Sequence, residues 1–131
     1  MIRIVVDANV ILSALLGGSA RFVLFDSRFE FVTAEFTYGE VRRYLPRVAE
    51  KSEVSITELE DALSLIPLVR HPRQYYRRAM PRARQALRRI DPYDADILAL
   101  YFVEGTYLWS EDRGFERVTP KIRLLKTKDF F

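Results

Sequence analysis

Short apolar runs rich in β-branched residues alternate with longer helical patterns along the whole chain. The runs predict buried strands at 2–6, 29–32, 106–109 and 122–125, with a brief further strand at 68–69. The intervening patterns predict helices over 8–16, 20–25, 34–50, 56–66, 73–89 and 92–103. Strands that alternate with helices in this way form a parallel sheet covered on both faces. The fold class expected is therefore α/β: one domain over residues 1–131, with four to five parallel strands and helices on both faces of the sheet.

Polar residues mark where several of these helices begin. Ser19 and Thr33 are expected N-caps, and Ser55 opens a capping box with Glu58. Asp91, followed by proline, opens the helix over 92–103, which is apolar almost all round and should be buried. Pro81 is expected to break or kink the helix over 73–89, because proline removes a helical hydrogen bond.

Composition removes several classes of function. The chain has no cysteine, which excludes disulfides, thiolate metal sites and cysteine catalysis. Its one histidine, His71, excludes any site that needs two imidazoles, and its place between Arg70 and Pro72 suggests an exposed loop. No apolar stretch approaches the roughly 20 residues that span a bilayer, and residues 1–10 do not form a signal peptide. A cytoplasmic protein without a membrane segment is expected.

Positive charge is concentrated in one segment of the sequence. Residues 70–89 contain eight arginines and no acid, which leaves 13 of the 21 basic residues and all 18 acidic ones elsewhere. Such a patch favours a polyanionic partner, most simply RNA. The alternatives are a solvated helix face or a patch for an acidic protein. The candidates for contact with the phosphate backbone are Arg73, Arg77, Arg78, Arg82, Arg84 and Arg88.

Four acids are predicted to meet at one edge of the sheet. Ligands of open α/β sheets bind beyond the carboxyl ends of the strands, where the strand order reverses. Each acid alone could be only a helix cap, a turn residue or a solvated side chain. Together they would repel each other strongly, and a hard divalent cation, Mg²⁺ or Mn²⁺, would relieve that repulsion. The four are Asp7, Glu40, Asp94 and Asp112.

These residues resemble the acidic quartet of PIN domains. The similarity rests on Asp7-Ala-Asn near the start, Glu40 in the third helix, Asp94-Ala before an apolar helix, and Trp109-Ser-Glu-Asp112. It covers nearly the whole chain, although each motif is short. The resemblance implies a magnesium- or manganese-dependent endoribonuclease, and many small members are toxins of the virulence-associated protein C type, held inactive by a cognate antitoxin.

Carried over by position, the resemblance assigns metal binding and catalysis to the same four acids and places Asn9 and Ser110 beside them as supporting polar residues. Asp96 lies two residues from Asp94, roughly 200° around a helix, so both side chains cannot point at one ion. Asp94 is preferred, Asp96 is kept as a neighbouring residue, and Glu116 is a candidate fifth carboxylate.

The expected reaction is hydrolysis of RNA phosphodiester bonds by a metal-activated water. The competing hypothesis is a catalytically weak PIN-like module that binds RNA or protein. A haloacid-dehalogenase-like phosphatase is disfavoured, because that chemistry needs an acid where Asn9 stands. The resemblance also suggests a homodimer. The peripheral helices carry more aromatic residues than one sheet face requires, and these either pack between helices or form the interface: Phe22, Phe25, Phe36 and Tyr44.

Overall fold

Five strands form one sheet in the computed structural model, which describes residues 1–87 and 91–131. All neighbouring strands are parallel, and their order is β3-β2-β1-β4-β5. The strands are β1 (Ile2–Val6), β2 (Phe29–Ala34), β3 (Leu68–His71), β4 (Tyr107–Trp109) and β5 (Leu124–Leu125). The order reverses at β1, so the carboxyl ends of β1 and β4 border the crevice in which such sheets bind ligands. The predicted α/β class and parallel sheet are confirmed.

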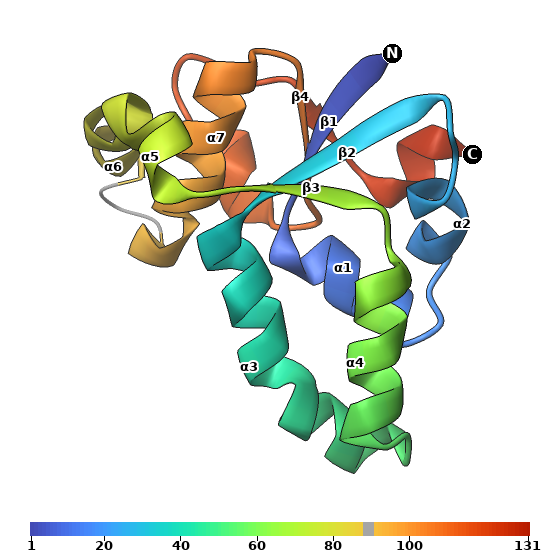
Figure 1. Ribbon diagram of the computed structural model, residues 1–131. Helices are drawn as coiled ribbons and strands as arrows, with labels where there is room; N and C mark the ends of the chain where they lie inside the picture. Colours follow the sequence, from blue (N-terminus) through green and yellow to red (C-terminus); the bar gives the residue numbers. More distant parts are fainter. Residues whose placement is uncertain (88–90) are drawn as a thin grey trace.

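Helices cover both faces of the sheet (Figure 1). On one face lie α1 (Ala8–Leu15), α2 (Ala20–Leu24), α3 (Glu35–Ser52) and α4 (Ile56–Leu65). On the other lie α5 (Arg73–Tyr76), α6 (Met80–Ala86) and α7 (Ala95–Glu104). Helices α3 and α4 run as an antiparallel pair that extends beyond the edge of the sheet at which β1 ends. Among the described residues, no helix is long and apolar enough to cross a bilayer.

The alternation of side chains in β1 supplies a separate core on each side of the sheet. Ile4 and Val6 pack with the first group of helices, and Val5 packs with α7 on the opposite face. Helix α7 is buried over most of its circumference, as its continuous apolar sequence predicts. Because the sheet and α7 are buried, the carboxyl end of β1 and the first turn of α7 have fixed positions. Two of the candidate acids, Asp7 and Asp94, lie at these positions.

Local structure differs from the sequence prediction at several helix ends. Thr33 is not a cap: it belongs to β2, where its hydroxyl donates to the Val6 carbonyl at 2.8 Å, and Ala34 precedes α3 instead. Ser19 makes no capping hydrogen bond, whereas Ser55 accepts from the Glu58 N–H at 3.1 Å, as predicted. The wrong cap at Thr33 follows from β2, which continues two residues beyond its apolar run.

The arginine-rich segment is not one helix. It consists of α5, a 3₁₀ turn η1 (Arg77–Ala79) and α6, and Pro81 stands in the first turn of α6, where proline needs no N–H partner. The end of the predicted helix, residues 88–90, lies outside the described residues. Farther along, Asp91 caps a 3₁₀ turn η2 (Pro92–Asp94) by accepting from the Tyr93 N–H at 2.9 Å, so α7 itself begins at Ala95. Asp94 is therefore the last residue before α7.

Candidate active site

Asp7 is held at the carboxyl end of β1 by contacts with β4 and α1. Its N–H donates to the Trp109 carbonyl at 3.0 Å, and its Oδ1 accepts from the Ala8 N–H at 2.8 Å. Only 6% of the residue is exposed. Burial raises the pKa of Asp7, although hydrogen bonds from Ser110 and Ala8 favour its charged form. A carboxyl group that is buried despite this cost is typical of a functional site.

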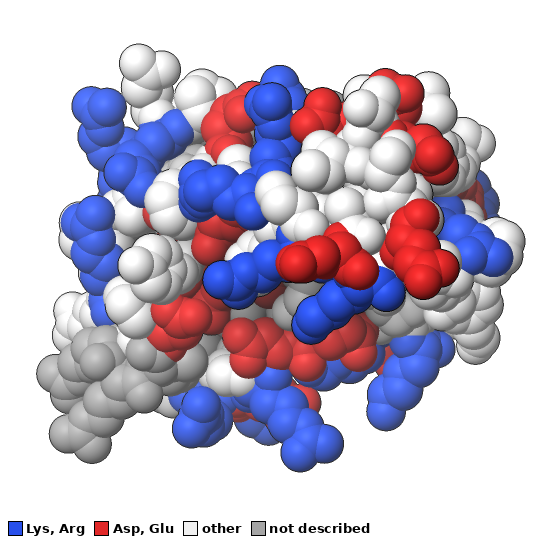
Figure 2. Space-filling view, turned by 90° about the horizontal axis from the view of Figure 1, so that it is seen from below, with Lys and Arg blue, Asp and Glu red and all other residues white. Residues whose placement is uncertain are grey.

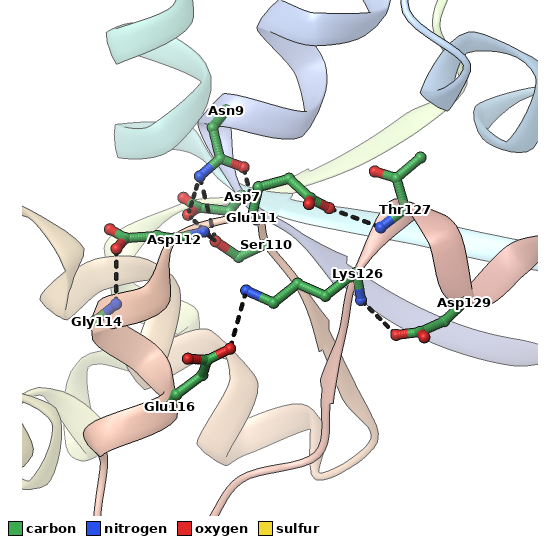
Figure 3. A network of polar contacts seen from close by, with 10 residues as sticks. All are labelled: Asp7, Asn9, Ser110, Glu111, Asp112, Gly114, Glu116, Lys126, Thr127 and Asp129. Carbon is green, nitrogen blue, oxygen red and sulfur yellow. Dashed lines mark hydrogen bonds and ion pairs between the residues drawn. The ribbon is translucent and has the colours of Figure 1, made fainter.

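Asn9 and Ser110 orient the Asp7 carboxylate and join it to the turn after β4 (Figure 3). The Ser110 hydroxyl donates to Asp7 Oδ2 at 2.7 Å and accepts from the Asp112 N–H at 3.0 Å. The Asn9 amide donates to Ser110 Oγ at 3.3 Å and to Asp7 Oδ2 at 3.4 Å, and its Oδ1 accepts from the Glu111 N–H at 3.2 Å. One network thus fixes two of the predicted acids, which are 105 residues apart in sequence, relative to each other.

Asp112 and Asp94 approach Asp7 from two further elements. Asp112 begins a 3₁₀ turn, η3 (Arg113–Arg117), and its Oδ1 accepts from the Gly114 N–H at 2.8 Å. Asp94 is half-buried at the start of α7, and its Oδ2 is buried without a hydrogen-bond partner among the described residues. Burial, followed by the charges of Asp7 and Asp112, raises the pKa of Asp94 to about 8. This oxygen therefore lacks the hydrogen-bond partner that a buried polar atom ordinarily has.

Glu40 reaches the same edge from α3. It is half-buried, and its pKa is raised to about 7 by burial and then by the charge of Asp7, against a smaller opposing effect of Arg43. Asp91 is a further acid at this edge, because its charge also raises the pKa of Asp7, Glu40 and Asp94. The sequence indicated Asp91 only as a cap. Its position beside the other acids depends on the turn η2, which the sequence pattern does not reveal.

Asp96 belongs to a different cluster from Asp94. It is 3% exposed and accepts two hydrogen bonds from the Arg73 guanidinium, at 2.9 and 3.0 Å, and one from the Tyr76 hydroxyl at 2.5 Å. Its oxygens are thus satisfied by protein groups, in contrast to Oδ2 of Asp94. Such a bidentate pair ties α5 to α7.

Glu116 lies at the outer side of this region. Its side chain is about half exposed and stands 3.7 Å from the Lys126 ammonium, measured from Glu116 Oε1 to Lys126 Nζ. Figure 3 shows this pair to one side of the network around Asp7 and Ser110. The Lys126 nitrogen is buried and has no hydrogen-bond partner in the described part of the chain. Neither the sequence pattern nor the resemblance indicated Lys126.

The predicted phosphate-binding arginines are placed unequally. Arg73 pairs with Asp96, and the Arg82 guanidinium lies 3.9 Å from the centre of the Phe102 ring. Three others are exposed on η1 and α6: Arg77, Arg78 and Arg84. Arg88 lies outside the described residues. Seen from the side on which β1 ends, acidic side chains gather near the middle of the molecule and lysine and arginine side chains stand around them (Figure 2).

The acids offer a donor set that suits a divalent cation. As the side chains stand, no three acids within residues 1–87 and 91–131 form a ready metal cluster. Nevertheless Asp94 Oδ2 is buried and unpartnered, and the negative charges of the neighbouring acids raise the pKa of Asp94 and Glu40. A cation with two positive charges would relieve this repulsion, and carboxylate oxygens are the ligands that Mg²⁺ and Mn²⁺ prefer. The residues present therefore fit such an ion.

The sequence matches the family model of the PIN domain over residues 5–127. No curated protein matches it.

Solved structures with a similar fold include three toxin–antitoxin assemblies. A chain of VapBC2 from Rickettsia felis, solved with a DNA fragment from the promoter, has a TM-score of 0.73 at 15% identity and covers 95% of this chain and 98% of its own. A chain of DNA-bound VapBC from Salmonella typhimurium has a TM-score of 0.70 at 23% identity, and the match covers 97% of this chain and 99% of that one. A chain of VapBC-1 from nontypeable Haemophilus influenzae has a TM-score of 0.63 at 17% identity, and the match covers 97% of this chain and 99% of that one. At these identities the similarity establishes the fold.

Proposed function

Because the chain belongs to the PIN domain family, we propose that it is an endoribonuclease that hydrolyses RNA phosphodiester bonds with Mg²⁺ or Mn²⁺ held by four carboxylates. These are Asp7, Glu40, Asp94 and Asp112. The observation that carries the proposal is Asp94: among the described residues its buried Oδ2 has no hydrogen-bond partner, and burial and then the charges of three neighbouring acids raise its pKa to about 8. This arrangement lowers the stability of the metal-free protein, and such perturbed carboxyl groups are characteristic of functional sites.

When bound, a divalent ion would supply Lewis-acid activation of water and would compensate the charge that develops on the phosphate. The residues of the chain provide its ligands and their orientation. Ser110 and Asn9 hold Asp7 through Oδ2, and the hydrogen bond from Gly114 holds Asp112 through Oδ1. No imidazole is needed: His71 stacks on Tyr75 at 3.9 Å between ring centres and lies 3.9 Å from Glu104 at the opposite end of α7 from Asp94.

Exposed arginines would hold the substrate beside these acids. Arg77, Arg78 and Arg84 are exposed along α5 to α6, close in sequence to Arg73, whose pairing with Asp96 places this segment against the first turn of α7. Contacts with phosphates supply most of the affinity for single-stranded nucleic acid, and they do not specify its sequence. Binding should therefore weaken as salt concentration rises.

The chain is further proposed to be the toxin of a toxin–antitoxin pair in the cytoplasm, and to form a homodimer. The supporting observations are the similarity to chains of VapBC assemblies and the aromatic side chains exposed on the peripheral helices. Phe22 is 63% exposed, Phe25 57% and Tyr44 47%, whereas Phe36 is half-buried. Light scattering tests the dimer: a monomer mass at every concentration contradicts it. Co-purification with the product of an adjacent small open reading frame tests the antitoxin.

The nuclease activity is tested by incubating the chain with single-stranded and structured RNA, with Mn²⁺ and with chelator. We expect cleavage only with the ion, and its loss in Asp94→Asn. Asp61→Asn is the matched control, because Asp61 is an exposed residue of α4 and the same charge is removed. Cleavage that persists in chelator, or an Asp94→Asn variant as active as Asp61→Asn, contradicts the proposed site.

A further inference from the structure

A small hollow between α6, α7 and the loop before β5 carries positive charge that the acidic site does not use. Its volume is about 230 Å³, and among its lining residues are Arg82, Phe102, Gly105, Lys121 and Ile122. That is smaller than the roughly 300–1,000 Å³ of sites for drug-sized ligands, so the hollow suits one compact unit.

Two cations flank an apolar surface in this hollow. The Arg82 guanidinium is stacked on the Phe102 ring, with 3.9 Å between its carbon and the ring centre. Lys121 is exposed on the opposite loop. Within the described residues, neither cation forms an ion pair with a carboxylate. The charges are therefore available to an external anion.

The loop that carries Lys121 is held in place by α7. The Arg123 N–H donates to the Tyr101 hydroxyl at 2.8 Å, and Ile122 packs against the core on the α7 side of the sheet. Pro120, which also lines the hollow, has a fixed φ. The wall opposite Arg82 is therefore ordered before a ligand arrives, which lowers the entropic cost of binding.

A second hollow adjoins the first. Its volume is about 180 Å³, and it shares Lys121 and Ile122 with the first. Its other lining includes Phe115 and Glu116 of η3, the turn that Asp112 begins. The two hollows thus share Lys121 and Ile122, and the second reaches η3, the turn that begins at Asp112.

We infer that the Arg82–Lys121 hollow is a nucleotide subsite: it binds the phosphate of a nucleotide between its two cations and the sugar or base against Phe102 and Ile122. The inference rests on the proposed function, and its natural ligand is either a nucleotide of the RNA strand that leads away from the acidic site or a free mononucleotide. Paired cations beside an aromatic ring are how proteins hold single strands without reading their sequence.

The test compares RNA binding by the full chain and by the Arg82→Ala/Lys121→Ala variant. Fluorescence anisotropy with a labelled single strand of roughly 12 nucleotides is measured in chelator, so that no strand is cut. The matched control is Arg47→Ala/Lys128→Ala. It removes the same two charges, and Arg47 is likewise stacked on an aromatic ring, that of Tyr44, on the other face of the sheet.

We expect the variant to bind RNA about 5- to 25-fold more weakly at 0.1 M salt and its slope of log K against log salt to fall by about 0.7–1.4, since each phosphate contact contributes about 0.7. The control should stay within about twofold of the wild type. Manganese-dependent cleavage of a dinucleotide, which has a single phosphodiester bond, should be unchanged in the variant.

Three outcomes separate the possibilities. Equal RNA binding by the variant and the control, with the wild type still cutting RNA, overturns the subsite alone. A wild type that neither binds nor cuts RNA overturns the proposed function. Adenosine monophosphate then tests the subsite alone, by a shift of the amide resonances of Gly105, Lys121 and Ile122. That result retains the nucleotide subsite and identifies the free mononucleotide as its ligand. Absence of both responses removes the subsite.

Discussion

Replacing Asp94 by asparagine should stabilise the metal-free protein at neutral and alkaline pH. Burial and the charges of Asp7 and Asp112 raise the pKa of Asp94 from 3.8 to about 8. A carboxyl group whose pKa is higher in the folded than in the unfolded state opposes folding when it is charged. This penalty is nearly absent below pH 4, accumulates as pH rises, and is complete above pH 8. Asparagine has the same shape and carries no charge at any pH.

The size of the effect follows from the difference between the two pKa values. About four units correspond to roughly 5–6 kcal/mol at 1.36 kcal/mol per unit. Asp94 is only half-buried, and solvent screens its interactions, so about 2–3 kcal/mol is a realistic gain. For a chain of this length that gain raises the melting temperature by roughly 8–12 °C.

Thermal unfolding in chelator from pH 4 to pH 9 measures this gain, with Asp61→Asn as the control. The melting temperatures of Asp94→Asn and wild type should diverge as pH rises and then stay a constant distance apart above pH 8. Asp61→Asn should follow the wild type throughout. A variant that is destabilised at pH 8, or that gains equally at pH 4 and pH 8, would refute the electrostatic account of Asp94.

Two further substitutions give different results for reasons that the same contacts supply. Asp96→Asn should destabilise the protein by about 1.5–3 kcal/mol, because it weakens the charged hydrogen bonds to Arg73 and Tyr76. A urea titration that finds Asp96→Asn as stable as the wild type would contradict this. Lys126→Met should leave the free energy of unfolding unchanged or raise it by about 1–2 kcal/mol. The lysine nitrogen is buried without a hydrogen bond among the described residues, and its partner Glu116 is half exposed. A loss above about 2 kcal/mol in the same titration would contradict that interpretation.

The features that could be predicted from the sequence are those that follow from periodicity. The last three residues of β1 and the first seven of α7 are buried, so their apolar runs identified both elements, and the carboxyl end of a parallel strand fixes where Asp7 must lie. The helical angle showed only that Asp94 and Asp96 cannot both point at one ion, and the choice of Asp94 followed the family pattern, in which the acid directly precedes the alanine. The structure adds a physical reason, because Asp96 is occupied by Arg73 and Tyr76.

The features that escaped prediction depend on contacts between distant segments. Thr33 was expected to cap a helix because its side chain can do so, but pairing with Arg70 of β3 extends β2 through it, and its hydroxyl donates to the Val6 carbonyl instead. The turn η2, which brings Asp91 beside the other acids, leaves no periodic pattern. Lys126 and Glu116 meet only once β5 is added to the sheet, and the nine residues between them carry no pattern that predicts this contact.

Titration of the metal-free chain with Mn²⁺ by calorimetry at pH 7, in buffers of different ionisation enthalpy, tests the central claim that these acids form one cation site. Since the pKa of Asp94 is about 8 and that of Glu40 about 7, both hold protons at pH 7 that a bound ion must displace. We expect saturable binding with release of about one to one and a half protons, lost in Asp94→Asn and retained in Asp61→Asn. Failure to bind Mn²⁺, or binding without proton release that survives Asp94→Asn, would contradict the claim.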